Sequence, residues 1–171
     1  MKYRNEEDRC YGVAGMVAGL SLMEAHDLMA EVTIERPPGE SIRFTPDFYF
    51  AGNPRLSASK SWRHIMGHFR VLVALAVANA LCRRMVLEQR RADSRLHDSL
   101  LEVACADAMD YCQLERDEVT PIFDEMYDRL TRLFADPQVR RGMTGFATAL
   151  RERRTLSSVD VMELMQELSI F

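Results

Sequence analysis

The chain has 171 residues, of which 47% are hydrophobic and 28% charged, and its formal net charge is −4. This length and composition are typical of one globular domain, residues 1–171, and exclude an intrinsically disordered chain. The negative balance does not favour binding of the whole molecule to nucleic acid or to an anionic membrane.

Cysteine usage and the N-terminal sequence indicate the compartment. The cysteines show no CxxC spacing, so we expect free thiols packed in a core. Glu6, Glu7 and Asp8 precede the first apolar run, which does not favour a signal peptide. We therefore expect a cytoplasmic protein. The four cysteines are Cys10, Cys82, Cys105 and Cys112.

The first predicted helix covers residues 5–28, where apolar side chains recur at helical spacing. Glycines inside it weaken the helix by up to about 1 kcal/mol each relative to alanine. Gly15 and Gly19 lie four residues apart, a small-xxx-small spacing that favours close approach of a second helix.

The next segment changes from helical spacing to alternation of apolar and polar residues. Two short alternating runs, 31–35 and 41–44, flank Pro37-Pro38-Gly39, and this pattern predicts a small β-hairpin. The alternative is that the first helix continues to Glu35 and that a long loop follows, up to residue 58.

A turn-rich segment, 45–58, carries three adjacent aromatic residues, Phe48, Tyr49 and Phe50. In one interpretation, Phe48 and Phe50 cap the core and Tyr49 lies at the surface. In the other, the three form a patch that binds a partner, because large aromatics are favoured as interface anchors.

The most apolar segment is the centre of a long helix predicted over Ser59–Arg91. From Val71 to Cys82 its only polar residue is Asn79. A helix that is apolar all round is buried all round, so other helices must surround this one. The run is too short to span a bilayer, and we expect no membrane segment. A buried Asn79 needs a hydrogen-bond partner.

Four further amphipathic helices follow, which gives six in total. We predict them at about 94–114, from Thr120-Pro121 to about 135, at 138–151, and from 155–158 to about 168. In the last one, Ser157 and Asp160 have capping-box spacing. The predicted fold class is therefore all-α: a bundle of about six helices around a buried central helix, with a small β-hairpin or long loop at 31–58.

His64 and His68 are candidates for binding a transition metal such as zinc. They lie four residues apart on the predicted central helix, so both project from one side of it. The residues between them include no glutamate, so the pattern of a zinc protease is absent. The Glu-x-x-His pattern of a di-iron bundle is also absent. Packing as structural histidines at a helix end is the alternative.

Arginine clusters such as Arg83-Arg84 raise the alternative of nucleic-acid binding through phosphates. Acidic residues interspersed among them favour solvated faces with ion pairs instead, so we expect no nucleic-acid partner.

No phosphate loop, nucleophile elbow or catalytic triad motif is present, and no residue is assigned a catalytic role. We predict a non-enzymatic interaction or structural protein that binds a protein partner or itself, through the aromatic loop or the last helix. Whether it is a monomer or a homo-oligomer is left open. The alternatives are a metal or small-ligand binder using His64 and His68, and an arginine-mediated nucleic-acid binder.

Overall fold

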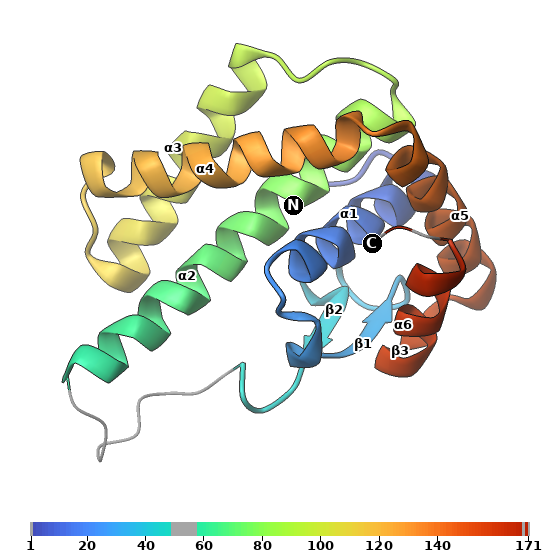
Figure 1. Cartoon of the computed structure of the whole chain (residues 1–171), viewed down its shortest axis with the longest axis horizontal. Coiled ribbons are helices and arrows are strands. Elements are labelled where there is room, and N and C mark those ends of the chain that lie inside the picture. Colours follow the sequence, from blue (N-terminus) through green and yellow to red (C-terminus); the bar gives the residue numbers. More distant parts are fainter. Residues whose placement is uncertain (1, 49–57, 169, 171) are drawn as a thin grey trace.

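The computed structural model describes residues 2–48, 58–168 and 170, and in this part the chain is mostly helical (Figure 1). It holds six α-helices and a three-stranded antiparallel sheet in the described residues, so the mainly helical class is confirmed. The arrangement of the helices as a bundle stays a prediction. The helices are α1 (Glu6–Leu22), α2 (Ala58–Leu81), α3 (Ser94–Cys112), α4 (Arg116–Ala135), α5 (Pro137–Arg153) and α6 (Ser158–Glu167), and the strands are β1 (Met29–Thr33), β2 (Ile42–Phe44) and β3 (Thr155–Ser157).

Helix α2 contacts α1, α3 and α4, and it runs between α1 and α4 in Figure 1. From Phe69 onwards most of its side chains are buried, which confirms the expected core segment. Arg70 is exposed, and from Val71 to Leu81 the partly exposed positions are Leu72, Ala76 and Ala80, which are spaced by four residues. One line of the helix surface is therefore less covered than the rest.

Helices α1 and α2 approach closely at the two predicted glycines. A Cβ atom on Gly15 would contact the carbonyl oxygen of Ala78 and lie 2.6 Å from the Cβ of Cys82. A Cβ atom on Gly19 would lie 3.0 Å from the carbonyl oxygen of Ala74. Close helix packing thus compensates for the low helix propensity of these glycines, as the sequence predicts.

The long helix ends differently from the prediction. After Leu81 the backbone forms a π-helical segment, Cys82–Leu87, and residues 89–93 are not helical. The predicted continuation to Arg91 is therefore wrong. The α-helical and π-helical parts form one continuous helix, Trp62–Leu87, which is the one helix in the described residues that is long and apolar enough to cross a membrane. The most apolar part of this helix has a mean hydropathy of 1.7, and 56% of that part is buried within the protein.

The predicted hairpin is present, and a third strand joins it. Strand β1 pairs antiparallel with β2 on one side and with β3 on the other, in the order β2-β1-β3. The sequence did not predict β3, because three residues are too short to show alternation. Leu156 at its centre is completely buried, and Ser157 and Asp160 form the predicted capping box of α6.

Helix α4 begins earlier than predicted, at Arg116 rather than at Thr120-Pro121. A capping box formed by Glu115 and Glu118 satisfies the first backbone N–H groups. Pro121 then lies inside the helix, where it removes one backbone hydrogen bond.

Candidate interaction surface

The N-terminal turns of α2 carry large apolar side chains that the described residues cover only in part. Trp62 is 46% exposed and Ile65 is 41% exposed, although both belong to the helix that forms the core further on. In Figure 1 this end of α2 extends away from the other helices. Exposed apolar patches on a folded protein often mark interaction sites.

The exposed end is continuous with an apolar groove between α2 and α3. Ile65, Phe69, Leu72 and Ala76 recur at spacings of three or four residues, so they form one stripe along α2. Val103 of α3, which is 50% exposed, lies on the opposite wall. The groove is lined by Phe69, Leu72, Val73, Ala76 and Val77 of α2, Leu100, Val103, Ala104 and Asp107 of α3, and Phe123 of α4.

We call the combined patch the α2 surface. It consists of Trp62, Ile65 and Leu72 on α2, and of Leu100 and Val103 on α3. It includes a projecting part, the exposed end of α2, and a small hollow, the groove, which has room for about one water molecule. Both parts lie on α-helices.

Among the described residues that line the groove, Asp107 is the only charged one. Partial burial raises the pKa of its carboxyl group, and the nearby carboxylate of Asp110 raises it further. No hydrogen bond or ion pair joins the side chain of Asp107 to another residue in the described part of the chain. The wall of α3 is therefore apolar except for one weakly acidic group.

The structure places the two predicted histidines next to this surface, on the exposed part of α2. The ring of His68 lies 4.5 Å from that of Phe48, between ring centroids, and partial burial lowers the pKa of His68. Phe48 also stacks on Phe44, with ring centroids 3.7 Å apart. Two residues predicted for separate sites, His68 and Phe48, are thus neighbours.

The remaining aromatic candidates, Tyr49 and Phe50, lie outside the described residues. Phe48 itself packs against the core through Phe44. This packing agrees with the interpretation in which Phe48 caps the core. The role of all three residues in binding a partner stays a prediction.

The described residues contain no group of three or more His, Cys, Asp or Glu side chains that could hold a metal ion. His64 and His68 bring two imidazoles within one helical turn, without a third ligand from a neighbouring element in the described part. The metal site at these histidines stays a prediction. All four cysteines are free thiols, and burial raises the pKa of Cys10 to about 11.

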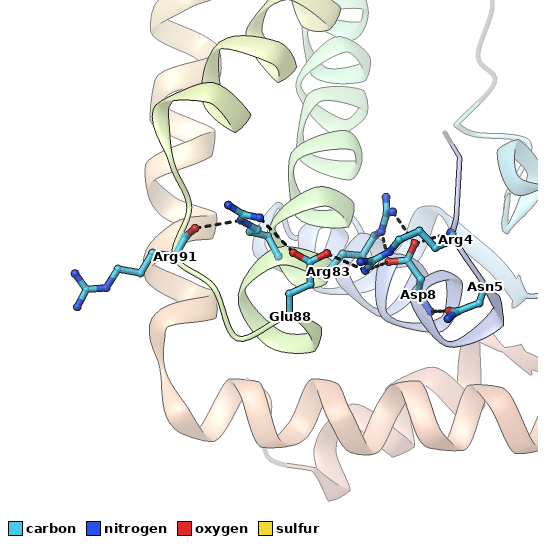
Figure 2. A network of polar contacts seen from close by, with 7 residues as sticks. Arg4, Asn5, Asp8, Arg83, Glu88 and Arg91 are labelled. Carbon is cyan, nitrogen blue, oxygen red and sulfur yellow. Dashed lines mark hydrogen bonds and ion pairs between the residues drawn. The ribbon is translucent and has the colours of Figure 1, made fainter.

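A cluster of charged groups, separate from the α2 surface, surrounds Asp8, whose side chain is 1% exposed (Figure 2). Its carboxylate accepts hydrogen bonds from the guanidinium groups of Arg83 and Arg4 and from the backbone N–H of Arg4. Asn5 caps α1 by accepting from the backbone N–H of Asp8 at 2.8 Å. Glu88 pairs with Arg4 at 2.8 Å.

This cluster joins the start of α1 to the π-helical end of α2, and its charges are matched within the fold. Arg84 likewise pairs with Glu88 and Asp93. Both members of the predicted Arg83-Arg84 cluster therefore bind carboxylates of the protein itself. The cluster has the character of a structural link between helices.

A further exposed apolar pair lies on the last helix, α6. Val159 is 64% exposed and Met162 is 37% exposed. This pair is the part of the structure that corresponds to the last-helix surface predicted from the sequence.

The sequence analysis did not assign the α2 surface. The available signal was the stripe spacing, which continues from Leu72 back to Ile65 without interruption. The spacing of apolar residues does not show which turns of the helix are buried by neighbouring helices.

Comparison with known proteins gives no match for this chain among family models, curated proteins or solved structures.

Proposed function

We propose that the protein is a non-enzymatic interaction protein that associates with a second copy of itself through the α2 surface. The observation that carries this proposal is the exposure of Trp62 and Ile65 on a stripe that continues into the groove between α2 and α3. Leaving two such side chains in water costs free energy that burial against a partner recovers, at roughly 25 cal/mol per Å² of apolar area.

The shape of the patch supports a second copy as the partner. A two-fold symmetric interface uses the same patch on both subunits, so that patch must contain both a projecting part and a part that receives it. The α2 surface contains both, about two helical turns apart: Trp62 and Ile65 project, and Leu72 and Val103 border the groove. An antiparallel pairing of two α2 helices would bring each projecting part to the other copy's groove.

The composition of the patch also supports this use. Tryptophan is among the residues most often found as energetic anchors of interfaces, and charged groups are depleted from interface centres. The α2 surface has Trp62 at one end and Asp107 as the only charged group lining its groove.

The test is the molar mass in solution, measured by sedimentation equilibrium at protein concentrations from about 1 to 100 µM. We expect wild-type protein to approach twice the monomer mass. Trp62→Ser/Ile65→Ser removes the projecting part, and we expect its dissociation constant to rise tenfold or more, because anchor residues typically cost more than about 1.4 kcal/mol when truncated. Both positions are exposed, so the variant should keep its fold.

The matched control is Val159→Ser/Met162→Ser, which removes the same kind of exposed apolar pair from α6. We expect this control to associate like the wild type. A wild-type protein that stays monomeric at 100 µM would contradict the proposal. Loss of association in the α6 variant alone would move the interface to the last helix. Trp62-dependent binding of a monomer to phosphatidylglycerol vesicles would point to a membrane surface instead.

A further inference from the structure

His97, in the first turn of α3, connects α3 to α4. Its Nε2 lies 2.9 Å from the Oδ1 atom of Asp124 on α4, and its Nδ1 lies 3.1 Å from the Oδ1 atom of Asp98 on α3. A ring with a carboxylate oxygen at each nitrogen donates both hydrogen bonds only when it is doubly protonated. The neutral ring carries one proton and loses one of the two bonds.

The same ring packs against two aromatic side chains of α4. Its centroid lies 5.2 Å from that of Phe123 and 4.8 Å from that of Tyr127, and both contacts are edge-on. Phe123 also lines the groove of the α2 surface. The histidine contact and the groove therefore share a side chain.

Helix α3 has few large buried side chains that could hold it in place without this contact. Its buried residues are Leu101, Ala104, Ala108 and Cys112, two of which are alanines with little apolar area. Besides the contacts of His97, the ion pair between Arg116 and Glu102 joins α4 to α3 in the described residues, and it is exposed. A helix held by little apolar burial opens locally at low free-energy cost.

We propose that protonated His97 stabilises the contact between α3 and α4, so that the α3 wall of the α2 surface is in place at neutral or acidic pH and opens more often at alkaline pH. This inference rests on the proposed function only where it concerns association. The opening of α3 itself is independent of any partner.

The charged groups around the ring support this direction. Partial burial alone lowers the pKa of His97, but the carboxylates of Asp98 and Asp124 outweigh it, so the net pKa is raised above its usual value. Tyr127, which packs against the His97 ring, has further charged groups near it. Arg84 of the π-helical segment pairs with Asp93, directly before α3, and Asp128 of α4 adds negative charge.

The raised pKa of His97 determines whether the contact between α3 and α4 strengthens or weakens as the pH rises. A group whose pKa is higher in the folded protein than in the unfolded chain stabilises the fold below the unfolded value, near 6.5. That contribution is lost as the pH rises through the folded value. The docked position of α3 therefore weakens with alkalinity, and it does not weaken with acid through this group.

The test is hydrogen exchange of the α3 amides at pH 6 and pH 9, expressed as protection factors so that the intrinsic pH dependence of exchange is removed. For the wild type, we expect protection in α3 to fall about two- to fivefold from pH 6 to pH 9, the range that corresponds to one partly exposed ion pair. His97→Gln should show the lower protection at both values and no pH step. Asp124→Asn keeps the shape of the contact and should reduce the step.

The matched control is His26→Gln, because His26 lies beside Asp27 in the short helical turn His26–Leu28 and not on α3. It should retain the wild-type step. A step that persists unchanged in both His97→Gln and Asp124→Asn, or equal wild-type protection at the two pH values, would overturn the inference.

Sedimentation of the same samples separates the two proposals. Weaker association at pH 9 in the wild type, but not in His97→Gln, is the expected result. A pH step in α3 protection without any association would leave the opening of α3 standing and contradict the proposed self-association. Association that is equally strong at both pH values, despite the step, would overturn the link between α3 and the interface.

Discussion

Arg83 donates two hydrogen bonds to the buried carboxylate of Asp8, from Nε to Oδ1 at 2.7 Å and from Nη2 to Oδ2 at 2.6 Å. This bidentate contact connects the first turn of α1 to the π-helical segment after α2. Burial alone raises the pKa of Asp8, but the hydrogen bonds from Arg83 and Arg4 outweigh this effect and hold the pKa well below its usual range. The ionised carboxylate is thus the stable form in the fold.

We expect Asp8→Asn to lower the free energy of unfolding by about 2–4 kcal/mol, because it leaves Arg83 without its anionic partner in a partly buried place. Urea denaturation followed by circular dichroism measures this change. Glu7→Gln is the control, since Glu7 is the exposed neighbour with the same charge, and it should change stability by less than about 0.5 kcal/mol.

The same contact also predicts a pH dependence. A depressed pKa means that the stabilisation by Asp8 is complete above the unfolded value, near 3.9, and is lost as the pH falls below it. Wild-type stability should therefore decrease more steeply than that of Asp8→Asn between about pH 4 and pH 2. Parallel decreases in the two proteins would contradict this assignment.

The close approach of α1 and α2 predicts opposite effects for two glycine substitutions. Gly15→Ala places a methyl group against Ala78 and Cys82, and we expect it to cost about 1–3 kcal/mol in overpacking. Gly67→Ala brings the added carbon within 4 Å of no described atom outside the backbone of its own helix, and it should raise helix stability by up to about 1 kcal/mol. Thermal unfolding of both variants measures the difference in sign. Equal effects would show that close packing is not the reason for Gly15.

The hydrogen bond between the buried amide of Asn79 and the hydroxyl group of Tyr3 predicts that removing this hydroxyl group lowers the stability of the fold. Asn79 Nδ2 donates to the hydroxyl oxygen of Tyr3 at 2.8 Å, which supplies the partner that the sequence analysis required. Tyr3→Phe leaves the amide without this acceptor, and we expect a loss of about 1–3 kcal/mol in urea denaturation.

Two companion variants test the reason for that loss. Asn79→Leu/Tyr3→Phe removes both polar groups and should recover part of the stability, because no buried donor is left unsatisfied. Tyr11→Phe is the control, since it removes a hydroxyl from a partly buried tyrosine of α1 that forms no side-chain hydrogen bond with the described residues. A loss in Tyr11→Phe as large as in Tyr3→Phe would assign the effect to something other than Asn79.

Some element boundaries could be predicted from the sequence and others could not. The capping box of Ser157 and Asp160 was visible as a spacing and is confirmed. The start of α4 was assigned to Pro121 because proline is common in a first turn, whereas the Glu115 and Glu118 capping box decides it. Both signals are local in the sequence, and the capping box of Glu115 and Glu118 outweighs the proline.

Strand β3 had no local signal of comparable strength. Thr155, Leu156 and Ser157 become a strand because β1 offers an open edge with which they pair. Such pairing joins residues more than a hundred positions apart. The spacing of apolar residues within either segment therefore cannot predict it.

The sequence by itself determined that the chain is mainly helical, that Val71–Cys82 forms the core of one helix, and that Gly15 and Gly19 face a close neighbour. These properties follow from spacing along a single helix, which is local information. Only the tertiary structure decided which turns of that helix are covered: Trp62 and Ile65 share the stripe of Leu72 but are exposed, and the N-terminal end of α2 extends away from the other helices in Figure 1. Likewise, Asp8 acquires Arg83, and His97 acquires Asp124, through packing between helices. Burial and charge pairing depend on contacts between distant segments, and these contacts carry both the proposed interface and its pH dependence.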